Sequence, residues 1–365
     1  MVRIVQMQQF DKIWLAFLLV CAIMKLGKEM PSRAFPVVYI QRGKQIGGIN
    51  MKKLALILAG VMMLASLAAC GAKGEQNITL ATGGTSGTYY AVGGVLQNVL
   101  NDKLALSDLT VASTGASTAN VNMITDGEAQ MAILQSDVIS YAHTGTNTFA
   151  ETGAEDNALW VAGLYNETVQ IIATPDITDV SQLAGKTVCM GDVGSGTRIN
   201  AEQVLAAYGM TADDVNAVAG SFQDGVDGIK DGRIDAAFTV AGAPTTAITD
   251  LATNNEFSMI SLTDEALAYI AENFPFLVQD NLPAGTYNGI DEETKCVAVQ
   301  AALVASKDVS EDVVYELLKA MFDNAGDLKA AHAKFEYLDA AYAAKGTVPL
   351  HPGAEKYYKE IGIIE

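Results

Sequence analysis

The stretch Ile-Thr-Leu-Ala-Thr-Gly-Gly-Thr-Ser-Gly-Thr-Tyr-Tyr at residues 78–90 decides the fold. Its first four residues are mostly apolar and suit a strand, and a loop rich in glycine and hydroxyl side chains follows. From Tyr89 onward, apolar residues recur at helical spacing, at Val92, Leu96 and Val99. The stretch therefore predicts a strand that passes through a short loop into the N-terminus of a helix.

The same unit of strand, loop and helix repeats along the chain. Further strands are predicted at residues 109–112, 131–134, 187–190, 236–240 and 297–305. Further helices are predicted at residues 121–125, 199–208, 313–322 and 330–342. Pro244 suits the first turn of another helix. Strands that alternate with helices in this way predict an α/β fold with parallel sheets.

The chain is too long for one comfortable hydrophobic core, because a body of about 300 residues normally divides. A long apolar run ends near residue 173, and a polar connector at residues 175–186 leads into a second series of units. The strand at 297–305 then returns to the first series. We expect two lobes, with residues 77–172 and 297–365 in lobe 1 and residues 173–296 in lobe 2.

Met51 begins a segment that is typical of an exported protein. Two lysines follow it, then an apolar stretch, then Leu-Ala-Ala-Cys ending at Cys70. This pattern predicts a signal peptide at residues 51–69. Its end resembles a bacterial lipobox, which implies that Cys70 becomes a lipidated N-terminus and that residues 70–76 form a tether. The alternative is a chance apolar helix with a buried cysteine.

Residues 1–50 have no role if the signal peptide starts at Met51, because a signal normally lies at the extreme N-terminus. Ile-Gly-Gly at residues 46–48 can be back-translated to a purine-rich hexamer resembling a ribosome-binding site. We therefore expect residues 1–50 to be untranslated or non-native, which the DNA sequence would decide. The alternative is a true extension with a second signal-like segment at residues 13–24.

The charge is divided unevenly along the chain. The 365 residues hold 23 basic and 42 acidic side chains, a formal net charge of −19. The first 69 residues hold 9 of the basic and 2 of the acidic side chains, which leaves −26 on residues 70–365. Nucleic-acid binding is excluded by this balance, because phosphates require clustered lysine and arginine. An anionic membrane surface would repel the body as well.

The sequence offers little support for catalysis or for a cofactor. Cys189 and Cys296 lie in short apolar runs and are predicted to be single buried thiols. The histidines are isolated and no Cys-x-x-Cys pair occurs, so no metal site is expected. The glycines fit no nucleotide-binding fingerprint, and Ser195 is not in a nucleophile elbow. We expect no enzymatic activity, although an exported enzyme on the same architecture stays a rival hypothesis.

Three loops rich in glycine, serine and threonine lead into helices, at residues 82–90, 113–120 and 191–198. The unpaired N–H groups and the dipole at a helix start can hold a carboxylate or phosphate without a cationic side chain. Loops at the carboxyl ends of two facing sheets would meet in one cleft. The alternative is that the serine, threonine and asparagine residues only cap their helices.

These loops and several other strings resemble the TAXI solute receptors of TRAP transporters. The resemblance covers about residues 77–363, and the matching strings lie at 83–94, 113–120, 127–137, 194–201, 231–244 and 350–354. The resemblance implies a two-lobed type II periplasmic-binding-protein fold, α/β in class, with a ligand cleft between the lobes. It also implies hinge closure of the lobes near residues 173 and 296.

The resemblance further implies which residues bind the ligand. The candidates are Thr85, Ser86, Thr88, Tyr89, Tyr90, Ser113, Ser117, Asn120, Gln135, Ser195, Gly196, Thr197, Arg198 and Gly242. Arg198 either clamps a carboxylate with its planar fork or points to solvent. His351 is expected to shape a Pro-Gly turn.

The function implied is that of an extracytoplasmic receptor, lipid-anchored to the bacterial cell membrane. It would be a monomer that captures a small carboxylate, such as glutamate, glutamine or a dicarboxylate, and delivers it to TRAP permease membrane subunits. Two alternatives share the same physical basis. One is an ABC-type binding lipoprotein for another small anion, and the other is a surface lipoprotein that senses a ligand without transport.

Overall fold

The structure is a computed structural model that describes residues 76–365, within a compact unit that runs over Ala72–Glu365. The predicted extension at 1–50, the signal peptide at 51–69, and Cys70 with its tether up to residue 75 lie outside the described residues. None of the described helices combines the length and the apolar character needed to cross a bilayer.

A single mixed sheet runs through both lobes, in the order β2-β1-β3-β10-β4-β7-β5-β6. In lobe 1, β1 is parallel to β2 and β3, and β10 is antiparallel to β3. In lobe 2, β5 is parallel to β6 and β7. The lobe 1 strands are β1 (Gln76–Ala81), β2 (Ser107–Ala112) and β3 (Met131–Gln135). The lobe 2 strands are β5 (Thr187–Cys189), β6 (Asn216–Val218), β7 (Ala236–Ala241), β8 (Ser258–Met259) and β9 (Val278–Leu282).

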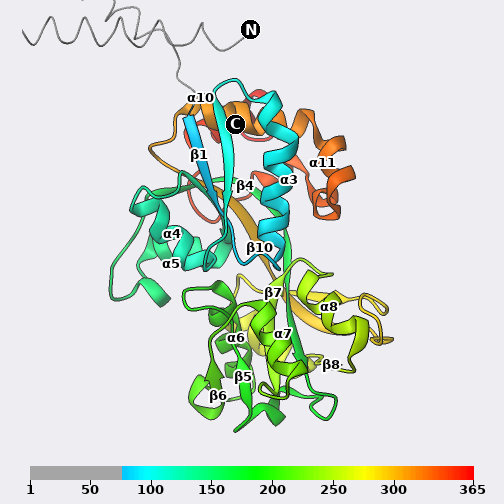
Figure 1. Ribbon diagram of the computed structural model, residues 1–365. Helices are drawn as coiled ribbons and strands as arrows, with labels where there is room; N and C mark the ends of the chain where they lie inside the picture. The colour runs from blue at the N-terminus through cyan, green and yellow to red at the C-terminus, as the bar shows by residue number, and fades with distance from the viewer. Residues whose placement is uncertain (1–75) are drawn as a thin grey trace, which may run out of the picture. The chain divides into compact units, whose positions relative to one another are not determined.

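Two long strands, β4 (Ala158–Ala173) and β10 (Thr294–Ser306), are shared between the lobes. The first part of β4 pairs with β10, and its last six residues pair with β7. Thr168 pairs with both neighbours, opposite Ala298 of β10 and Ala241 of β7. Figure 1 shows both strands passing from one lobe into the other. This arrangement is the type II periplasmic-binding-protein fold.

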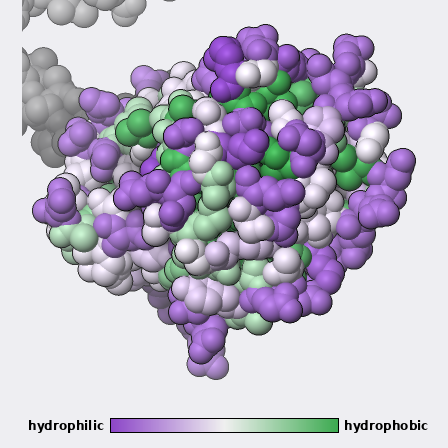
Figure 2. Space-filling model, turned by 90° about the horizontal axis from the view of Figure 1, so that it is seen from below, coloured by the Kyte–Doolittle hydropathy of each residue, from purple (hydrophilic) through white to green (hydrophobic). Residues whose placement is uncertain are grey.

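Helices cover both faces of the sheet in each lobe, so that each lobe has its own buried core. Lobe 1 contains α3 (Thr88–Leu100), α4 (Ser117–Thr125), α5 (Ser136–Thr144), α10 (Glu311–Asp323), α11 (Ala325–Ala331), α12 (Ala340–Ala343) and α13 (Pro352–Glu360). Lobe 2 contains α6 (Gly196–Ala207), α7 (Phe222–Lys230), α8 (Thr246–Asn254) and α9 (Asp264–Asn273). Seen from below, the molecule presents hydrophilic side chains interrupted by small hydrophobic patches (Figure 2).

The prediction of a single helix at residues 330–342 is wrong. The chain there forms the end of α11, a 3₁₀ turn η5 (Ala333–Tyr337) and the short helix α12. His332 is extended, and its ring nitrogen accepts a hydrogen bond from the Lys334 N–H. Asp339 is also extended and caps α12. These two polar side chains stabilise helix starts, and they interrupt the apolar periodicity that suggested one helix.

Two other predicted boundaries are corrected. The helix α4 begins at Ser117 rather than at residue 121, so the polar loop before it is shorter than predicted. Pro244 lies before the N-cap of α8 and not in its first turn. The N-cap residue is Thr245, whose N–H donates to the Tyr287 hydroxyl and whose backbone is extended.

The prediction for the two body cysteines is confirmed. Cys189 and Cys296 are free and buried. Burial raises the pKa of the Cys296 thiol to about 12, so this group stays a neutral thiol in the core.

Candidate ligand-binding site

A cavity lies where the loops of the two lobes meet. Lobe 1 supplies residues of the β1–α3 loop, the start of α4 and the end of β3. Lobe 2 supplies the β5–α6 loop, the start of α7 and the end of β7, and β4 supplies Glu167. The cavity measures about 40 Å³ on a scale where one ordered water needs roughly 10–15 Å³. It therefore suits a small molecule and not a polymer.

The first wall is the start of α3. Its N-cap is Gly87, and no side chain caps the helix. The first N–H groups of a helix have no partner within it, so those of Thr88 and Tyr89 stay available to a ligand. A Cβ on Gly87 would lie 3.2 Å from the Gly84 carbonyl oxygen, which explains why the tight loop carries glycine here.

The second wall is the start of α4 together with the end of β3. Ala116 precedes the helix with a φ of 67°, a value that L residues rarely adopt. The Ser117 hydroxyl accepts a hydrogen bond from the Gln135 N–H at 3.2 Å. This contact holds the Gln135 side chain beside the cavity, where its Oε1 atom is buried without a partner.

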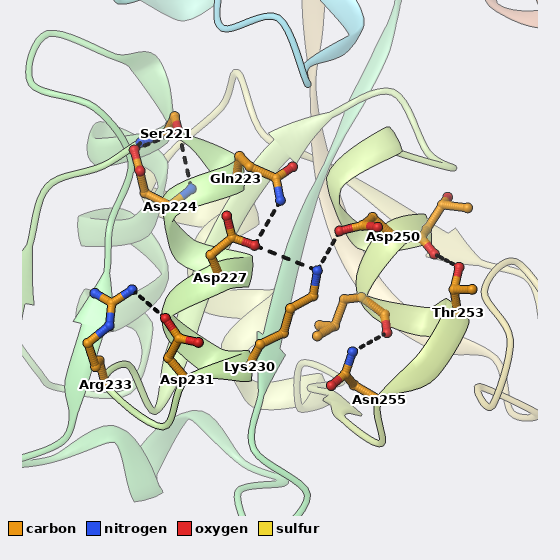
Figure 3. Close-up of polar contacts among 12 residues, drawn as sticks. Ser221, Gln223, Asp224, Asp227, Lys230, Asp231, Arg233, Asp250, Thr253 and Asn255 are labelled. Carbon is orange, nitrogen blue, oxygen red and sulfur yellow. Dashed lines mark hydrogen bonds and ion pairs between the residues drawn. The ribbon is translucent and has the colours of Figure 1, made fainter.

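The lobe 2 wall is built from two more helix starts. Ser195 caps α6 by accepting from the Arg198 N–H. The N–H groups of Gly196 and Thr197, which line the cavity, have no partner within the helix. Ser221 caps α7 in a reciprocal pair with Asp224, as Figure 3 shows. The N-termini of helices from both lobes thus converge on one small space.

An acidic side chain that the sequence prediction missed also lines the cavity. Glu167 is 1% exposed and projects from β4. Burial raises the pKa of the Glu167 carboxyl to about 8. The side chains of Tyr89 and Gln135 lower this pKa, but the effect of burial is larger. The carboxyl is therefore mostly protonated at neutral pH.

The structure brings together part of the predicted site. The predicted residues that line the cavity are Ser86, Thr88, Tyr89, Ser117, Gln135, Ser195, Gly196 and Thr197. The predicted residues outside the lining are Thr85, Tyr90, Ser113, Asn120, Arg198 and Gly242. Thr85 and Tyr90 are exposed.

Three of the residues outside the lining are held by other partners. The buried Asn120 amide donates to the carbonyl oxygens of Thr82 at 2.7 Å and Ile133 at 2.8 Å. The Ser113 hydroxyl donates to a loop carbonyl. Arg198 pairs with Glu202 along α6, with 2.6 Å between Nε and Oε1. Arg198 therefore lies outside the cavity lining, and both alternatives for it, a carboxylate clamp or a side chain that points to solvent, stay predictions.

Other lining residues were missed, and each has a physical reason. Ser221 and Phe222 follow β6, a strand of three residues, none of them buried. The sequence therefore has no apolar run that predicts this strand. Asp192 lies in a loop that was recognised for its glycines and hydroxyls. Glu167 interrupts an otherwise apolar run, and a lone acid in a buried strand was the available signal.

The lobes are in contact across the cavity. The Thr88 hydroxyl of lobe 1 donates to the Gly242 carbonyl of lobe 2 at 3.1 Å. The Thr118 N–H at the start of α4 donates to the Gly194 carbonyl at 2.9 Å. These bonds join the two walls, so the structure represents a closed arrangement of the lobes.

A further contact between the lobes is buried. Asn200 of α6 donates through its side-chain amide to the Asp137 carboxylate of α5 at 3.0 Å. Burial raises the pKa of Asp137 to about 6. Within residues 76–365, no group of three or more His, Cys, Asp and Glu side chains is placed to hold a metal ion.

Residues 80–362 match the model of the NMT1-like family. The chain belongs to the NMT1-like family. That match covers more than half of the chain and all of the cavity-lining residues.

Three of the solved structures that are similar to this chain are the following. The alkanesulfonate-binding protein SsuA from Xanthomonas axonopodis pv. citri is 12% identical, with 78% of this chain and 84% of that chain covered and a TM-score of 0.43. PhnD1 from Prochlorococcus marinus, in complex with methylphosphonate, is 12% identical, with 79% and 99% covered and a TM-score of 0.46. A putative L-cystine ABC transporter protein from Listeria monocytogenes is 15% identical, with 71% and 95% covered and a TM-score of 0.43.

Proposed function

We propose that this protein is an extracytoplasmic receptor that captures a small carboxylate by closing its two lobes around it. One observation carries the proposal. Helix starts from both lobes line the same cavity, at Thr88 and Tyr89 of α3, Ser117 of α4, and Gly196 and Thr197 of α6. At α4 only the first N–H group remains for a ligand, because the next two donate to the Gly194 carbonyl oxygen. Such N–H groups bind an anion without a cationic side chain, and the cavity lining contains no lysine or arginine.

A ligand that contacts both walls favours the closed arrangement, because only that arrangement supplies all the donors at once. The closing contacts are few and polar, among them the bond from the Thr88 hydroxyl to the Gly242 carbonyl. We propose that the closed form is what a membrane permease recognises. The resemblance to TAXI receptors favours TRAP membrane subunits as that permease.

A thermal-shift panel on residues 71–365 tests the ligand class. This length leaves the compact unit Ala72–Glu365 intact. The panel contains L-glutamate, L-glutamine, glutarate, methylphosphonate, an alkanesulfonate and glucose. A ligand at a hundredfold excess over its Kd stabilises the folded state by about 2.7 kcal/mol, so a carboxylate should raise the melting temperature by several degrees.

The other compounds in the panel separate this proposal from its alternatives. Stabilisation by the phosphonate or the sulfonate alone would favour a binding protein for another small anion. Stabilisation by glucose alone would contradict the anion-binding role of the helix starts.

We also propose that Cys70 carries the lipid that holds the receptor at the membrane. Replacing Cys70 by alanine should move the protein from the membrane fraction to the soluble fraction of fractionated cells, because a soluble body without its lipid has no anchor. Replacing Cys189 by alanine is the matched control and should leave the protein in the membrane fraction. Retention of the Cys70→Ala variant on membranes would contradict the anchor.

A further inference from the structure

The carboxyl group of Glu167 is buried against the cavity with one oxygen unsatisfied. Its Oε2 atom accepts from the Gln135 Nε2 atom at 3.5 Å, and its Oε1 atom has no partner. The hydroxyl groups of Tyr89 and Tyr165 nearby are buried too, and neither forms a hydrogen bond of good geometry, although Tyr89 lies close enough to the Glu167 carboxyl to lower its pKa. Buried polar groups are normally satisfied. This cluster therefore lacks a component, and Glu167 faces the space where the component would fit.

The charged surroundings of Glu167 indicate what that component is. Apart from Tyr89, the ionisable side chains of the cavity lining are the two acids Glu167 and Asp192. One cation, Lys334 of η5, acts on the Glu167 carboxyl and lowers its pKa, but Lys334 does not line the cavity, and its Nζ atom is 6.0 Å from the centroid of the Tyr165 ring. Among the described residues, no ion pair includes Lys334.

Other titratable groups packed around Glu167 supply no positive charge. Asp137 of α5 is an acid, and Tyr165 of β4 and Tyr342 of α12 are neutral phenols whose pKa values are raised by burial. A carboxylate in this position needs a cationic partner to stay ionised. The protein does not place one at the Oε1 atom.

We propose that Glu167 receives the ammonium group of the bound solute, so that the receptor selects amino acids over carboxylates without an amino group and releases a proton on binding. This inference rests on the proposed function, because the carboxylate end of the solute occupies the helix starts. The two ends of an amino acid then meet two chemically different ends of one cavity.

The proton balance of this step is simple. In the empty cavity Glu167 is a neutral acid at neutral pH, since burial raises the pKa of its carboxyl to about 8. The arriving ammonium keeps its own protons and favours the carboxylate form. The O–H bond of Glu167 breaks, its proton passes to solvent, and an ion pair between the ammonium and the carboxylate forms.

Matched ligand pairs that differ only in the amino group test the proposal. The pairs are L-glutamate with glutarate, L-alanine with propionate and L-leucine with 4-methylpentanoate, each titrated calorimetrically. We expect at least one amino acid to bind roughly 10- to 100-fold more tightly than its partner, as a charge-assisted hydrogen bond in a buried site allows. Titration in buffers of different ionisation enthalpy should show release of about one proton at about pH 6.5 and only about a quarter of a proton at about pH 8.5, where the amino group of the ligand is still protonated.

Two variants assign the effect to one carboxyl. Glu167→Gln keeps the shape and polarity of the side chain but cannot ionise, so it should abolish proton release and bring each pair to within about threefold in affinity. Tyr165→Phe is the matched control, because it removes a neighbouring hydroxyl and keeps the acid. It should retain both proton release and the preference for the amino acid.

The possible failures are distinguishable. If the carboxylates without an amino group bind as tightly as the amino acids, or if binding takes up a proton, this inference is wrong while the proposed function stands. If no carboxylate in any pair binds and a phosphonate or sulfonate does, the proposed function is wrong as well. If the Glu167→Gln variant binds an amino acid and releases as many protons as the wild type, the inference is also wrong.

Discussion

Replacing Gly196 by alanine is expected to weaken ligand binding by roughly 10- to 100-fold while the protein remains folded. In the closed arrangement, a Cβ on Gly196 would lie 1.8 Å from the Oε1 atom and 2.4 Å from the Cδ atom of Gln135. Gln135 belongs to lobe 1 and Gly196 to lobe 2. The added methyl group therefore clashes with Gln135 in the closed arrangement and fits only when the lobes are apart.

Two responses to the added methyl group are possible, and both reduce affinity. Either the lobes stay apart, or Gln135 turns away and loses its contact with Glu167. Overpacking of this kind costs about 1–3 kcal/mol, and a cost to the binding-competent state appears directly in the apparent Kd. Calorimetric titration with the best compound of the thermal-shift panel measures the effect.

Gly94→Ala is the matched control for this experiment. Gly94 also lies in a helix that opens at the cavity, but nothing lies within 4 Å of its added Cβ. This variant should bind like the wild type. An affinity of Gly196→Ala within about twofold of the wild type, below the roughly fivefold loss that the smallest overpacking cost implies, would show that closure does not bring the two residues together.

Replacing Glu167 by glutamine is expected to make the ligand-free protein several kcal/mol more stable than the wild type at about pH 8, with little difference at about pH 4.5. The pKa of Glu167 is about 8 in the folded protein and near the ordinary 4.5 in the unfolded chain. Between these pH values the folded state holds a proton that the unfolded state has lost. The wild type therefore loses stability as pH rises through this window, by up to about 1.4 kcal/mol per pH unit.

Chemical denaturation of the ligand-free protein at a series of pH values checks this expectation. Asp137, whose pKa burial raises to about 6, contributes a slope of the same sign at lower pH in both proteins. The difference between wild type and Glu167→Gln isolates Glu167. Tyr165→Phe should keep the wild-type slope. Parallel curves for wild type and Glu167→Gln would mean that Glu167 is ionised in the empty cavity.

Much of the fold could be predicted because its elements have strong local patterns. The strand β1 and the helix α3 follow from alternating strand and helix periodicity in one short stretch. The long strands β4 and β10 were visible as apolar runs because both are buried along most of their length. The prediction of one helix at residues 330–342 failed because the helices there have only 4–7 residues, and polar caps at His332 and Asp339 determine where they begin.

The site could be predicted only where it consists of glycine and hydroxyl loops. Ser117, Ser195 and Thr197 lie at the carboxyl ends of recognisable strands, and the structure places them on the cavity. Asn120 is also a small polar residue in the first turn of a helix that opens at the cavity, yet its side-chain amide donates to buried carbonyl oxygens. Whether a polar residue faces a ligand or its own backbone depends on contacts far apart in the sequence. The sequence shows Glu167 only as a lone acid in an apolar run, and its place in the site could not be predicted because its neighbours come from α3, β3 and η5.

The shared strand β4 gives Glu167 a position that no residue on a helix start has. Glu167 lies opposite Val299 of β10. The next residue is Thr168, at which the pairing of β4 changes from β10 to β7. A residue at such a crossover stays near the pivot when the lobes separate, whereas the helix starts on either side travel apart. A solute entering the open protein would therefore meet the acid first and the full set of N–H donors last. Discrimination by charge would then precede closure, and a wrongly charged molecule would leave before the lobes had moved.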